Sequence, residues 1–75
     1  MRPINQIAQD IRREWKNVNY GAKPYLYAMF ELTDKNSRCG YDSAKGIILY
    51  FLSNAASFRG PVASQLKKEL KQHIK

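Results

Sequence analysis

One long apolar stretch, residues 44–55 (AKGIILYFLSNA), constrains the fold of this chain most strongly. On a helix, at about 100° per residue, most of its apolar side chains, including Ile47 and Phe51, cover about half of the circumference. Leu49 and Tyr50 fall on the other half. A helix that is apolar on so many sides must be surrounded by other elements. Because 75 residues can build only one core, we expect a single helical domain over residues 1–75.

Three further segments have the signals of helices. In residues 3–18 the apolar side chains recur at helical spacing, and Pro24 and Pro61 each suit the first turn of a later helix. The segment 33–41 is polar and rich in turn-forming residues, which predicts a loop. The sequence therefore predicts an all-α, four-helix bundle-like domain with helices at 3–18, 23–33, 43–56 and 61–74 and a central hydrophobic third helix. The expected core is Ile11, Trp15, Leu26, Met29, Ile47, Ile48, Phe51, Leu52, Leu66 and Leu70.

Composition and cysteine use indicate the cellular setting. Cys39 is the only cysteine, so no intramolecular disulfide can form, and a reducing, cytoplasmic compartment is the simplest expectation. We expect no signal peptide, because no apolar stretch follows Arg2, and no association with a membrane, because no apolar run approaches the ~18 residues of a membrane span. Thirteen Lys and Arg against six Asp and Glu give a formal net charge of +7, which favours polyanions or acidic protein surfaces as partners.

The sequence lacks the signatures of common enzymes. It has no Gly-rich phosphate loop, no paired-Cys or Cys/His zinc spacing and no serine-nucleophile motif. The loop acids Asp34 and Asp42 do not form a calcium site, because Arg38 and Cys39 occupy positions that need oxygen ligands or glycine. A catalytic Cys–His pair formed by Cys39 and the only histidine, His73, would need in addition a third group that orients it and a sheltered pocket. We therefore expect no enzyme, metal or cofactor, with His73 at the surface of a helix end.

Positive charges gather on two predicted helices. On the first, the arginines and the lysine lie together opposite the apolar stripe, and on the fourth, four lysines share one arc of the helix wheel. These faces are either solvated surfaces or binding surfaces, and lysines near a carboxyl end also complement the helix dipole. The candidate nucleic-acid- or partner-binding residues are Arg12, Arg13, Lys16, Tyr20, Phe58, Arg59, Lys67, Lys68, Lys71 and Lys75.

Two stretches resemble a known group of proteins. Residues 20–29 (YGAKPYLYAM) and 50–60 (YFLSNAASFRG) are similar to patterns in small proteins encoded by bacteriophages and prophages. Those proteins have no assigned activity, so the resemblance assigns no functional residue. It implies a bacterial or phage setting, with the protein in the cytoplasm of the host cell, and a non-enzymatic role.

Two functions fit these observations. Nucleic-acid binding would use phosphate contacts without strong sequence specificity, because the predicted fourth helix offers no bidentate Arg or Asn set for base edges. Alternatively, Phe58, Arg59 and the tyrosines would anchor a protein interface, since aromatic residues and Arg are enriched at such contacts. Leu49 and Tyr50 would bury themselves in a homodimer if the other helices do not cover them.

Overall fold

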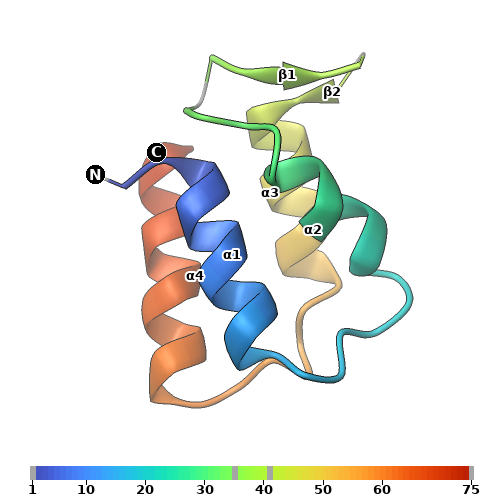
Figure 1. Cartoon of the computed structure of the whole chain (residues 1–75), viewed down its shortest axis with the longest axis vertical. Helices are drawn as coiled ribbons and strands as arrows, with labels where there is room; N and C mark the ends of the chain where they lie inside the picture. The colour runs from blue at the N-terminus through green and yellow to red at the C-terminus, as the bar shows by residue number, and fades with distance from the viewer. Residues whose placement is uncertain (1, 35, 41, 75) are drawn as a thin grey trace.

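Helices form most of the part of the chain that the computed structural model describes, residues 2–34, 36–40 and 42–74. The described helices are α1 (Ile4–Glu14), α2 (Lys23–Met29), α3 (Ala44–Ser53) and α4 (Pro61–His73). Two short strands, β1 (Arg38–Cys39) and β2 (Asp42–Ser43), pair antiparallel, so β1 lies within the segment 33–41 predicted as a loop and β2 follows that segment directly before α3. The mainly helical class of the domain is therefore confirmed (Figure 1).

The helix starts follow local sequence signals. The Ser43 hydroxyl accepts a hydrogen bond from the Gly46 N–H at 3.2 Å, which is the cap expected for the apolar helix. Pro24 and Pro61 both lie in first turns, where a missing N–H has no cost. Gly60 has φ of 113°, a conformation that residues with a side chain rarely adopt, and it turns the chain into α4.

Tertiary contacts shorten the first two helices relative to the prediction. α1 ends at Glu14 because the backbone of Trp15 is extended, and the Trp15 ring stacks on Phe58 with centroids 5.0 Å apart. The first-turn N–H groups of α1 have no side-chain cap. Instead, Ile4 N–H donates to the Thr33 carbonyl at 2.8 Å, and the next residue donates to the Leu32 carbonyl at 2.9 Å. The segment after α2 thereby satisfies donors that a helix start leaves unpaired.

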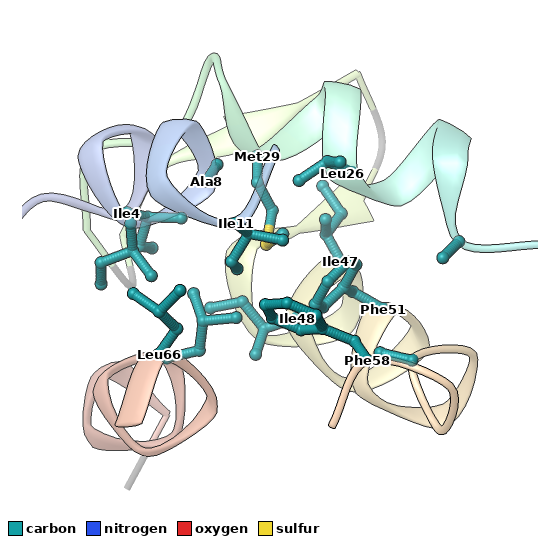
Figure 2. Close-up of a cluster of buried hydrophobic side chains, with 14 of the residues drawn as sticks. Ile4, Ala8, Ile11, Leu26, Met29, Ile47, Ile48, Phe51, Phe58 and Leu66 are labelled. Carbon is teal, nitrogen blue, oxygen red and sulfur yellow. The ribbon is translucent and has the colours of Figure 1, made fainter. Parts of the chain in front are cut away.

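All four described helices contribute to one core. α1 packs beside α4, and α2 packs on α3 (Figure 1). Figure 2 shows side chains from each helix meeting in a single cluster, with Phe58 at its edge near the end of α3. Nine of the ten expected core residues are buried, and the tenth, Leu52, is partly buried against the cluster.

The apolar helix α3 is enclosed on only part of its circumference, although we expected other elements to surround it. Ile47, Ile48 and Phe51 are buried, but the side chains of Leu49 and Tyr50 are 46% and 54% exposed. The packing of α2 and α4 against α3 leaves this side of the helix open. The Tyr50 ring is partly covered, because it stacks on Tyr25 of α2 with centroids 5.4 Å apart.

Candidate functional site: a basic groove between α1 and α2

Three of the predicted binding residues line one hollow in the surface. Arg12 and Arg13 come from the last turn of α1, and Lys16 follows the end of that helix. Lys23, the first residue of α2, contributes a fourth cation. The hollow has a volume of about 750 Å³. We call it the basic groove, and we define it by these four cations and the aromatic residues described below.

Local structure explains how these cations meet. Arg12 and Arg13 are exposed on α1 because the helix directs its apolar stripe into the core. A tight turn then reverses the chain, with the Ala22 N–H donating to the Asn19 carbonyl at 3.0 Å. This reversal places Lys23 across the hollow from α1.

The positive charge of the basic groove is largely uncompensated. None of the described residues that line the hollow is an Asp or a Glu. Arg13 is paired, because its guanidinium lies 2.8 Å from Asp10 Oδ1. Arg12, Lys16 and Lys23 form no ion pair with any described residue. Since unpaired cations with no acid between them attract anions, these three side chains give the hollow its electrostatic character.

Aromatic side chains form a wall of the basic groove. The Tyr27 ring stacks on Phe30 with centroids 6.2 Å apart and an angle of 26° between the ring planes. Half of the Tyr27 side chain is exposed, whereas Phe30 is partly buried against the core. The third aromatic residue, Trp15, is only 6% exposed and borders the hollow from the core side. The basic groove therefore combines cations with one accessible ring.

The candidate binding residues named from the sequence did not include Lys23, Tyr27 or Phe30. The first two lie at positions i and i+4 of α2 and so share a face of that helix, which was a usable signal. Which element faces these side chains depends on how α2 packs against α1.

Comparison with known proteins yields no relative. No family model, curated protein or solved structure matches the chain. The described residues contain no group of three His, Cys, Asp or Glu that could hold a metal ion. Among the helices that the structure describes, none is long and apolar enough to cross a bilayer.

The lysine arc of α4 is only partly available for binding. Lys67 Nζ donates a hydrogen bond to the Ala55 carbonyl at 2.8 Å and lies 5.9 Å from the centroid of the Phe58 ring. Burial lowers the pKa of Lys67, and the nearby charges of Lys71 and Arg59 lower it further. Lys67 therefore joins α4 to the end of α3, contrary to the expectation of a free phosphate contact.

The remaining predicted residues are scattered. Arg59, Lys68 and Lys71 are exposed outside the basic groove, and Lys75 lies outside the described residues. Tyr20 is 90% exposed in the turn before α2 but does not line the hollow. The expectation that Phe58 offers an exposed aromatic anchor is wrong, because this side chain is only 5% exposed. Its ring packs on Trp15 instead of facing solvent.

A polar cluster near the two chain ends has a structural role. Arg2 forms a two-pronged pair with Glu69 at 2.7 and 2.8 Å and also donates to Asp10 at 2.6 Å. The hydrogen bond from Arg2 holds the pKa of Asp10 below its ordinary value, and the bonds to Glu69 and Asp10 raise the pKa of Arg2. The two carboxylates thus compensate the positive charge of Arg2, so Arg2 does not extend the positive face of α1.

The expectation that His73 lies at the surface is wrong. Its side chain is only 6% exposed, and its Nε2 lies 2.6 Å from the Arg2 carbonyl oxygen. An N–H at Nε2 donates to this carbonyl, which ties the end of α4 to the segment before α1. His73 therefore links the end of α4 to the segment before α1. These two segments lie side by side in Figure 1.

Proposed function

We propose that this chain is a small, basic, non-enzymatic module that binds nucleic acid through phosphate contacts without strong sequence specificity. The observation that carries the proposal is the meeting of Arg12, Lys16 and Lys23, each without a described ion-pair partner, around one hollow that no acid lines. Neutralising phosphates with Lys and Arg releases condensed counterions, which drives sequence-independent binding. The formal net charge of +7 supports the encounter.

Weak sequence specificity follows from the shape of this site. Proteins that read base edges in a duplex place a projecting helix or a β-ribbon in the major groove. Here the cations surround a hollow between α1 and α2. This arrangement suits contacts with the phosphates of a backbone that runs along the surface better than contacts with base edges in the major groove. The proposal includes a four-helix bundle-like architecture. It also includes a cytoplasmic setting in a bacterial or phage-infected cell, which the resemblance to phage proteins implies.

The test is a titration of a fluorescent oligonucleotide of about 16 nucleotides between about 50 and 200 mM salt, read by anisotropy. Three phosphate contacts predict that log K falls against log salt with a slope of about −2 for a single strand. The groove variant, Arg12→Gln with Lys16→Gln and Lys23→Gln, should lose most of the affinity and most of this slope.

A matched control separates the basic groove from net charge alone. Lys45→Gln with Lys68→Gln and Lys71→Gln removes the same charge from exposed positions outside the hollow. We expect this variant to retain most of the affinity of the unmodified protein. Equal losses in the two variants, or binding that does not change with salt, would refute the basic groove as the site.

A second candidate function is binding to a protein partner with an acidic surface. It is favoured by the exposure of Tyr20 at 90% and of Tyr50 at 54%, because exposed aromatic residues and arginines such as Arg59 anchor interfaces. Capture of a partner from nuclease-treated bacterial lysate, lost on Tyr20→Ala with Arg59→Ala, would support this function. It would be refuted if the capture does not depend on these residues.

A homodimer is a related proposal. The exposed side chains of Leu49 and Tyr50 lie on one side of α3 and would be self-complementary across a two-fold axis. Sedimentation equilibrium at several concentrations tests it. A mass that stays monomeric at high micromolar concentration removes the dimer, and a dimer unaffected by Leu49→Lys removes this surface as its cause.

A further inference from the structure

We infer that the basic groove accepts a single strand of nucleic acid, with one unpaired base stacked on Tyr27 and the adjoining phosphates on Arg12, Lys16 and Lys23. This inference rests on the proposed function and names its substrate class. The chemistry is shared by single-stranded DNA and RNA, because both present unstacked bases beside a regular row of phosphates.

The concave shape of the site favours a single strand over a duplex. A duplex presents its phosphates on a convex surface and keeps its bases stacked inside, so none of its bases can enter a hollow between two helices. A single strand can turn one base out of line at little cost. The basic groove, with a volume of about 750 Å³, lies between the end of α1 and the face of α2, so its cations can contact the backbone on either side of such a base.

The Tyr27 ring is ordered by its own neighbours before any base stacks on it. Phe30 packs against its ring with centroids 6.2 Å apart and is itself partly buried against the core. This support restricts the orientation of the Tyr27 ring, while half of the side chain stays exposed. A pre-ordered ring loses less conformational freedom when a base stacks on it. Stacking also tolerates any base, which agrees with binding that has little sequence specificity.

The other exposed tyrosines lack this setting. Tyr20 is 90% exposed but belongs to the turn before α2 and does not line the hollow. Tyr50 is 54% exposed and stacks on Tyr25, yet it lies outside the basic groove. Tyr27 is therefore the one exposed tyrosine of the described residues that shares a hollow with the unpaired cations. This difference supplies controls of the same residue type.

The experiment compares oligo(dT), oligo(U) and a DNA duplex, each of about 16 nucleotides or base pairs, by anisotropy at low salt. The unmodified protein should bind at least one single strand more tightly than the duplex, and the stronger of the two identifies the natural strand. Tyr27→Ala should weaken single-strand binding by roughly 5- to 150-fold with the salt slope unchanged. Tyr27→Phe, which keeps the ring, should restore it, and Tyr50→Ala should leave it unchanged.

The outcomes separate this inference from the proposed function. Suppose that the duplex binds as tightly as both single strands and Tyr27→Ala binds like the unmodified protein, while the groove variant loses affinity. The stacking inference is then overturned and phosphate binding stands. No salt-sensitive binding to any of the three probes overturns both and directs attention to a protein partner. Circular dichroism of each variant establishes that the helices are intact.

Discussion

Replacing Phe58 tests the tertiary packing most directly. Its ring stacks on Trp15 at 5.0 Å between centroids, Lys67 Nζ lies 5.9 Å from its centroid, and only 5% of the side chain is exposed. Phe58→Ala removes all of these contacts from a position between α3 and α4 and leaves a cavity beside Trp15.

The expected loss follows from the contacts. Burying a Phe side chain contributes about 1.5–3 kcal/mol, and the aromatic pair adds about 0.5–1.5 kcal/mol. With the cavity, Phe→Ala in a core costs about 3–5 kcal/mol. At about 0.05–0.15 kcal/mol per residue, a domain of this length has about 4–11 kcal/mol of unfolding free energy in total. Phe58→Ala should therefore remove at least about a quarter of the unfolding free energy, and at most all of it.

Urea unfolding, followed by Trp15 fluorescence and far-UV circular dichroism, measures this loss. Phe58→Leu should give an intermediate loss with an unchanged m-value, because it keeps most of the buried volume but not the ring contacts. Tyr20→Ala is the matched control, because Tyr20 is 90% exposed, and it should change stability by no more than about 0.5 kcal/mol. A loss below about 1 kcal/mol for Phe58→Ala would contradict a buried, stacked ring.

Three further predictions concern buried or paired polar groups. Lys67→Met should reduce the unfolding free energy by about 1 kcal/mol in urea, because it leaves the Ala55 carbonyl, just after α3, without its donor, while Lys71→Met should not. The hydrogen bond from Arg2 lowers the pKa of Asp10 below 3.8. The stabilisation that ionised Asp10 gives to the folded state is therefore present above pH 3.8 and is lost as the pH falls through the lowered pKa. Asp10→Asn should therefore flatten the acid side of the stability profile, and equal profiles would contradict this pair. His73→Ala should cost about 1–3 kcal/mol by leaving the Arg2 carbonyl unpaired, and a thermal midpoint equal to that of the unmodified protein would contradict the buried bond.

Local signals in the sequence determined the helices and most of the core. The spacing of apolar residues depends only on the helix period, and the first-turn prolines and the Ser43 cap act on their own neighbours. For the same reason, Arg12 and Arg13 could be assigned to one exposed face of α1, since both lie on the same helix. Nine of the ten expected core residues were therefore correct.

Only the tertiary structure decided where the chain departs from this periodicity. α1 ends at Glu14, and the extended residue that follows, Trp15, stacks on Phe58, a residue far along the chain. Lys67 and His73 turn inward because carbonyl oxygens of distant segments need donors at those points. No local pattern encodes such pairings, since each depends on which elements meet.

The candidate site shows the same division. Arg12, Arg13 and Lys16 are close in sequence, so their shared position followed from the sequence alone. Tyr27 and Lys23 join them only after the turn before α2 reverses the chain, and the hollow exists only because α1 and α2 pack at that place. A sequence determines which side chains share a helix face, whereas the faces that meet are chosen by the burial of apolar surface over the whole chain.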